Sequence, residues 1–124
     1  MTFGTTTLGE RYRYALIRPG DQPEAILLGT ADQQRALLGG PLDHGTLSRH
    51  FFYAVYEFSI TERWALNAHL HRGNIDLPIH GPCLIYKTDD AGSTIDIDDA
   101  DLLAITALWA EARAGHNPDS LTLG

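Results

Sequence analysis

The chain is poor in cysteine, in long apolar runs and in positive charge. Cys83 is the single cysteine among 124 residues, so no disulfide can form within the chain. The longest apolar run is far short of the roughly 20 residues that span a bilayer, and no secretory signal pattern is evident. These absences predict a cytoplasmic protein that does not engage a membrane.

Acidic residues outnumber basic ones, 16 against 9, and the formal net charge is −7. An acidic surface repels a phosphate backbone, so nucleic acid is not an expected partner. The acids are concentrated between Asp89 and Asp101. We interpret this stretch as a solvated turn followed by a helix N-terminus, where the helix dipole favours carboxylates. An EF-hand does not fit, because no register supplies both the glycine and the final glutamate.

Motifs of the common catalytic folds are also missing. The sequence contains no Walker A loop, no G-x-G-x-x-G and no G-x-S-x-G. Carboxylates are paired only in expected turns, whereas general acid–base catalysis usually needs buried groups with shifted pKa values. Cys83 lies in an apolar segment and is interpreted as a small core residue. We therefore favour a non-enzymatic protein and predict no cofactor.

Length and composition are those of one ordinary globular domain, with 44% hydrophobic and 20% charged residues. We place the domain at residues 11–115. Residues 1–10 are expected to form a flexible N-terminal arm, and residues 116–124 a flexible C-terminal tail.

Alternation of polar and apolar residues predicts several strands. Arg11–Arg18 and Pro23–Leu28 flank a turn and should form a hairpin. His50–Ile60 is apolar on both faces, which indicates a central strand covered on both sides or a contact between subunits. Cys83–Lys87 is a further strand. Pro78 makes the segment before it an edge or bulged piece.

Two segments have weaker patterns. Leu42–Arg49 is rich in small polar residues and is predicted to be a loop. Trp64–Leu70 is compatible with a short helix or a strand, and we expect a partly irregular connection there.

Two helices complete the expected fold. Residues 31–38 follow Thr30 as N-cap, with Gln33 completing a capping box, and should end at Gly39-Gly40. A second helix runs from Asp96 or Asp98 to Ala114, with one buried stripe. Its members are Leu102, Ile105, Trp109 and Ala112. The predicted class is α+β: a small mixed or antiparallel sheet of about 4–5 strands with two helices packed on it.

Polar residues of the types that bind ligands surround the least regular segment. Histidines at 69, 71 and 80 could hold a metal with an open position for water, but their spacing matches no specific motif, and no metal is predicted. Arginine, asparagine and histidine together can also bind phosphate, carboxylate or a base. The candidate ligand- or partner-binding residues are Arg63, Asn67, His69, His71, Arg72, Asn74 and His80.

A series of short motifs resembles a small family of phages, plasmids and many bacteria, known as a domain of unknown function. In order, the motifs are Arg18-Pro19-Gly20, Pro23-Glu-Ala-Ile, Leu37-Leu38-Gly39-Gly40, Asn67, His80-Gly81-Pro82-x-Leu84-Ile85 and an acidic turn from Asp89 to Gly92 before a helix. The resemblance covers about residues 14–108. It implies an accessory protein of mobile elements, such as a regulator or an antagonist of host defence.

Three functions follow as expectations. The first is a non-enzymatic accessory or regulatory protein that binds a protein partner, or itself through His50–Ile60. The second is a module that binds a small, nucleotide-like ligand through the polar set. The third is a metal hydrolase that depends on the histidines.

Overall fold

The computed structural model describes residues 11–29, 31–48, 50–58, 64–72 and 75–114. The expected N-terminal arm and C-terminal tail lie outside these residues, as does the predicted helix cap Thr30. Within them, the secondary structure consists of two helices and eight strands.

A six-stranded antiparallel sheet forms the centre of the molecule, in the order β2-β1-β7-β4-β3, with β8 paired to β7. These strands are β1 (Tyr12–Ile17), β2 (Glu24–Leu28), β3 (Leu42–Thr46), β4 (Phe51–Tyr56), β7 (Cys83–Thr88) and β8 (Thr94–Ile95). The predicted hairpin is confirmed, because β1 and β2 are antiparallel neighbours. The α+β class is also confirmed, although the sheet is larger than expected.

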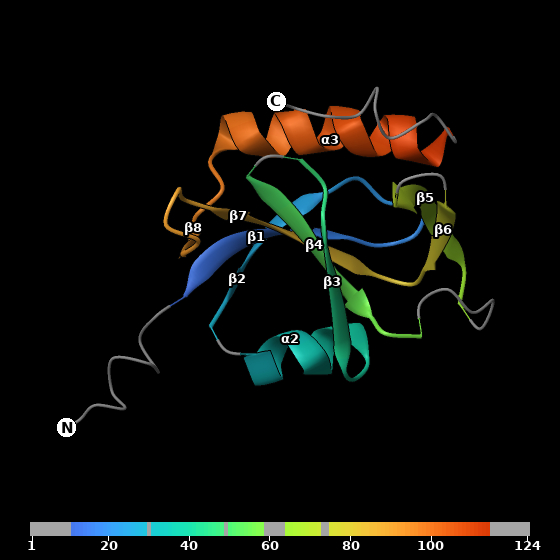
Figure 1. Cartoon of the computed structure of the whole chain (residues 1–124), viewed down its shortest axis with the longest axis horizontal. Coiled ribbons are helices and arrows are strands. Elements are labelled where there is room, and N and C mark those ends of the chain that lie inside the picture. Colours follow the sequence, from blue (N-terminus) through green and yellow to red (C-terminus); the bar gives the residue numbers. More distant parts are fainter. Residues whose placement is uncertain (1–10, 30, 49, 59–63, 73–74, 115–124) are drawn as a thin grey trace.

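The two helices lie on opposite faces of this sheet (Figure 1). α3 (Asp99–Arg113) covers one face and the shorter α2 (Ala31–Leu38) covers part of the other. Strand β4 lies between β3 and β7, and its side chains enter the cores on both faces of the sheet. Tyr53 and Val55 belong to the core under α3, whereas Ala54 belongs to the core under α2. The prediction of a central strand covered on both sides is therefore confirmed.

The residues predicted as the buried stripe of the last helix do face the sheet. Trp109, Ile105 and Ala112 are fully buried, together with Leu108, while Leu102 lies half-buried at the margin. Asp98 caps the helix: its side chain accepts from the backbone N–H of Asp101, whose side chain accepts in return from the Asp98 N–H. This reciprocal capping satisfies two donors that a helix start leaves unpaired.

Residues 42–46 form strand β3, so the prediction of a loop was wrong there. The strand pairs along its whole length with β4, and Gly45 lies opposite Tyr53. A Cβ on Gly45 would lie 2.2 Å from the Tyr53 ring, so the absence of a side chain makes room for that ring. Cross-strand packing with an aromatic neighbour here overrides weak local propensity.

Of the alternatives for Trp64–Leu70, the strand is the one that the structure has from Leu66 onward, and irregularity is limited to the start of the segment. β5 (Leu66–Arg72) pairs with β6 (Ile75–His80) as a separate two-stranded sheet. Ala68 and Leu70 are buried, and β5 packs against α3. Pro78 lies on β6, which is an edge strand because this sheet has only two strands, as the proline pattern predicted. The register also shifts between Leu66 and Ala68 of β5.

Helix α2 has the predicted bounds. Gly39 and Gly40 follow it with φ values of 108° and 151°, and both amides donate to the carbonyl of Arg35. Leu38 is buried and Leu37 packs beside it. At eight residues, the helix spans about 12 Å. It therefore leaves part of its sheet face uncovered.

Candidate functional site

The structure describes the side chains of only three of the seven residues predicted as a binding site, so that prediction stays a prediction. Arg63 and Asn74 lie outside the described residues. His71 and Arg72 lie on β5, but their side chains are not described. The three whose side chains are described are Asn67, His69 and His80.

Asn67 is 3% exposed, and its side-chain amide forms hydrogen bonds within the fold. Its Nδ2 donates to the carbonyls of Ile17 and Gly81, at 2.8 and 2.9 Å. Its Oδ1 accepts from Trp109 Nε1 and from Arg113, both at 3.0 Å. Two donors and two acceptor positions are thus occupied, which is the capacity of an amide. Asn67 joins elements of the fold rather than presenting groups to solvent.

The two candidate histidines whose side chains are described have different hydrogen-bond partners. His69 Nδ1 lies 3.1 Å from the Asp76 carboxylate, and His80 Nδ1 lies 2.8 Å from the backbone oxygen of Trp64. Among the residues that the structure describes, no three His, Cys, Asp or Glu side chains are grouped so as to hold a metal. The metal-hydrolase hypothesis therefore gains no support from these residues.

Two motifs of the sequence meet around Asn67. The turn that contains Gly81 receives its side-chain hydrogen bond. Arg113, which also bonds Asn67, donates in addition to the carbonyls of Arg18 and Asp21 in the β1–β2 loop. The β1–β2 loop is thus bonded to the end of α3 through Arg113, and the Gly81 turn is joined to the same network through Asn67.

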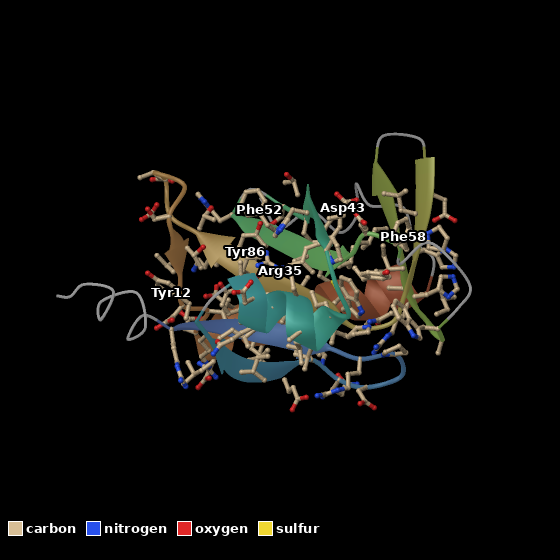
Figure 2. The ribbon with its side chains drawn as sticks, turned by 90° about the horizontal axis from the view of Figure 1, so that it is seen from below. Tyr12, Arg35, Asp43, Phe52, Phe58 and Tyr86 are labelled. Carbon is tan, nitrogen blue, oxygen red and sulfur yellow. The ribbon has the colours of Figure 1, made fainter. Side chains whose placement is uncertain are left out.

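Another surface gathers aromatic side chains into a row. Tyr14, Tyr86 and Phe52 lie on the neighbouring strands β1, β7 and β4, on the face that α2 leaves partly open. Tyr86 is the cross-strand partner of Phe52, and their rings stack at 5.5 Å with an interplanar angle of 22°. The Tyr14 and Tyr86 rings are 6.1 Å apart. Figure 2 shows Tyr86 and Phe52 on this face, beside Arg35 of α2.

The row borders two adjoining hollows, each of about 360 Å³. They share Tyr86 and Thr94, and we call them together the aromatic groove. The hollow beside α2 is lined by Tyr14, Ala31, Gln34, Arg35, Leu42, His44, Tyr86 and Thr94. The hollow beside the β7–β8 turn is lined by Phe52, Tyr86, Thr88, Gly92 and Thr94.

Hydrogen bonds hold the tyrosines of the groove in place. Tyr86 Oη lies 3.1 Å from His44 Nδ1, and Tyr14 Oη accepts from Gln34 Nε2 at 3.1 Å. Burial raises the pKa of Tyr86, and burial together with the neighbouring tyrosines raises the pKa of Tyr14. Both hydroxyls are therefore neutral at physiological pH, where they can orient a ligand but do not act as bases.

The charge of the groove differs from that of the whole chain. Arg35 lines it, and no carboxylate is among its described lining residues, although the chain carries a net charge of −7. Arg35 forms an ion pair with Asp32 one turn away on α2. The lining also lacks a thiol. It can stack, donate hydrogen bonds and attract an anion, which are properties of a binding site.

The sequence indicates which side chains of a strand share a face, but it does not indicate which strands lie side by side in this groove. Alternation places the tyrosines of β1 on one face and predicts the face of Phe52. The order of strands, which brings β1, β7 and β4 side by side, depends on pairings between distant segments. Without that order, Tyr86 cannot be assigned to the same surface as Tyr14 and Phe52.

None of the helices in the described residues has the length and apolar character needed to cross a membrane. No family model matches the chain, and neither a curated protein nor a solved structure shows significant similarity to it. The resemblance noted from short motifs thus gains no support from these comparisons.

Proposed function

We propose that the protein is a non-catalytic binding protein that takes up a small planar molecule in the aromatic groove. The observation that carries this proposal is the row of Tyr14, Tyr86 and Phe52 beside hollows of about 360 Å³. This volume lies within the range of about 300–1,000 Å³ that is typical of small-molecule sites. Aromatic walls with a few polar groups are also typical of such sites. The proposal keeps the small-ligand hypothesis but moves the site to a different surface.

A screen of planar compounds by thermal denaturation tests this proposal. A ligand that binds only the native state raises the melting temperature, and a panel of nucleobases, nucleosides and flavins supplies suitable rings. Phe52→Leu should reduce the shift, because it removes one ring of the aromatic row. Phe58→Leu is the matched control, since Phe58 is 53% exposed and is not among the residues lining the groove. Absence of any shift in the wild type, or equal shifts in both variants, would refute the proposal.

A second candidate function is the binding of a protein partner, as in the accessory role inferred from the sequence. An aromatic corner supports it: Phe58 and Leu66 are 53% and 45% exposed. Tyr56 lies 5.5 Å from Phe58 and 5.2 Å from Trp64, between ring centroids. Aromatic residues are enriched in the centres of protein interfaces.

Self-association at the aromatic corner is the form of this function that is simplest to test. Both edges of β4 are paired within the sheet, so a second copy would have to contact side chains rather than the strand backbone. Light scattering should then report a dimer for the wild type and a monomer for Phe58→Asp. Phe52→Leu serves as the control and should leave the mass unchanged. A wild-type monomer at high protein concentration would count against self-association.

A further inference from the structure

We propose that the planar ligand carries an anionic group and belongs to the class of free nucleoside monophosphates. The base would lie in the hollow at Phe52 and Tyr86, and the phosphate would lie beside Arg35. This inference rests on the proposed function, because it names the ligand class of the same groove.

The two hollows of the groove differ in chemistry. The hollow beside the β7–β8 turn has two aromatic rings and two threonines, and none of its described lining residues is charged. The hollow beside α2 contains Arg35, Gln34 and His44. Tyr86 lines both, so one molecule can extend from the first into the second. A ligand that matches this arrangement has an apolar ring at one end and a charged group at the other.

The hollow at Phe52 and Tyr86 has features that suit the stacking of a nucleobase. Phe52 and Tyr86 already stack on one another, and a base can extend such a stack without specific hydrogen bonds. Thr88 and Thr94 are cross-strand partners and supply hydroxyls that can donate or accept at the edge of a base. Gly92 also lines this hollow, and a Cβ built there would meet nothing within 4 Å.

The charged end is suited to an anion. The guanidinium of Arg35 presents several N–H groups in a plane and can donate two of them to phosphate. Its ion pair with Asp32 is on the surface, where such pairs are weak, and it leaves other N–H groups of the planar fork for a ligand. No carboxylate is among the described lining residues, and a bound phosphate would compete with Asp32 for the guanidinium of Arg35.

A free nucleotide fits better than a nucleic acid strand. A strand would bring one phosphate for every nucleotide against a protein of net charge −7, and binding to strands draws on many basic contacts. A single phosphate requires only one. We therefore assign the groove to mononucleotides.

Isothermal titration calorimetry with AMP, adenosine and ribose 5-phosphate separates the contributions of ring and anion. AMP should bind most tightly. Arg35→Gln should weaken AMP about tenfold and leave adenosine unchanged. Arg18→Gln is the matched control: Arg18 is 50% exposed in an ion pair with Glu24, and Arg35 is 46% exposed in its own pair. This control should change affinity by less than about twofold.

Phe52→Leu tests the ring in the same experiment. It should weaken AMP and adenosine equally, by about tenfold, because stacking does not depend on the phosphate. Amide shifts of the wild type in NMR provide a readout that does not depend on a variant folding. AMP should perturb the signals of Thr88, Gly92 and Arg35, and ribose 5-phosphate that of Arg35 alone.

The outcomes distinguish the two proposals. Equal affinities for AMP and adenosine, with no effect of Arg35→Gln, would overturn the nucleotide assignment and leave the proposed function in place. A short single-stranded oligonucleotide that binds more tightly than AMP would overturn the choice of a free nucleotide. If none of the three compounds binds or perturbs amide signals in the groove, the nucleotide assignment fails. The planar-compound screen then decides the proposed function independently.

Discussion

The indole Nε1 of Trp109 donates a 3.0 Å hydrogen bond to the side-chain oxygen of Asn67 inside the core. The two residues are 42 positions apart in the chain and come from α3 and β5. Both are buried, so the bond is shielded from competition with water. It joins α3 to β5 and accounts for a polar residue at this depth in the core.

Replacing Asn67 by alanine should lower the free energy of unfolding by about 3–5 kcal/mol. The substitution leaves the carbonyls of Ile17 and Gly81 and the N–H of Trp109 without their partner, and each unpaired buried group costs about 1–3 kcal/mol. Urea denaturation provides the measurement. Gln22→Ala, at an exposed position, should change stability by less than about 0.5 kcal/mol. A loss below about 1 kcal/mol for Asn67→Ala would show that water replaces the amide.

Gly40→Ala should be more destabilising than Gly92→Ala. Both glycines have positive φ values, 151° and 86°, so any side chain introduces backbone strain of about 1–2 kcal/mol. At Gly40, the new Cβ would also lie 2.8 Å from the Tyr56 ring, whereas at Gly92 it would meet nothing. We expect losses of about 2–3 and about 1 kcal/mol from thermal or urea unfolding. Equal losses would mean that Tyr56 moves aside freely.

Asp101 should contribute to the acid sensitivity of the fold. Its partial burial by itself would raise the pKa, but the N–H of Asp98 and the ammonium of Lys87, 3.0 Å away, outweigh this effect and hold the pKa below 3.8. Because the folded-state pKa is the lower one, the stabilisation is present above about pH 4 and is lost as pH falls through the folded value.

Unfolding in urea across this pH range measures the contribution of Asp101. Wild type should lose more stability between pH 5 and pH 3 than Asp101→Asn, which has no carboxylate to protonate at that position. The variant itself should be less stable than wild type at pH 7. Stability curves that run parallel in acid would show that Asp101 titrates equally in the folded and unfolded states.

Cys83 should be unreactive toward thiol reagents in the native protein. Its side chain is fully buried, and burial raises the pKa of the thiol, so the reactive thiolate is scarce. Labelling with a chromogenic disulfide at neutral pH should be slow in buffer and complete in denaturant. Rapid labelling without denaturant would indicate frequent local opening of β7.

Short-range patterns in the sequence predicted most elements correctly. The hairpin β1–β2, the glycine-terminated α2, the central β4 and the amphipathic α3 all have signals within about 15 consecutive residues. β3 was missed, and β5 was left ambiguous between helix and strand, because neither has strong strand propensity. β3 is stabilised by its pairing with β4, and β5 by β6 and by packing on α3, and both kinds of contact come from outside the segment.

The predicted site also shows that a local pattern does not reveal whether a polar side chain is buried. Asn67 was singled out because polar residues of its type bind ligands, but its amide is used inside the fold. A polar residue looks the same in a sequence whether it faces solvent or satisfies buried carbonyls. The two cases differ only in what surrounds the side chain after folding.

The sequence by itself determined the class of the fold, the ends of its helices and the faces of its central strand, because backbone propensity and hydrophobic periodicity act between near neighbours. Only the tertiary structure decided that Tyr14, Phe52 and Tyr86 share one surface and that Asn67 lies inside. Strand order and burial arise from contacts between distant residues, and no local pattern specifies them.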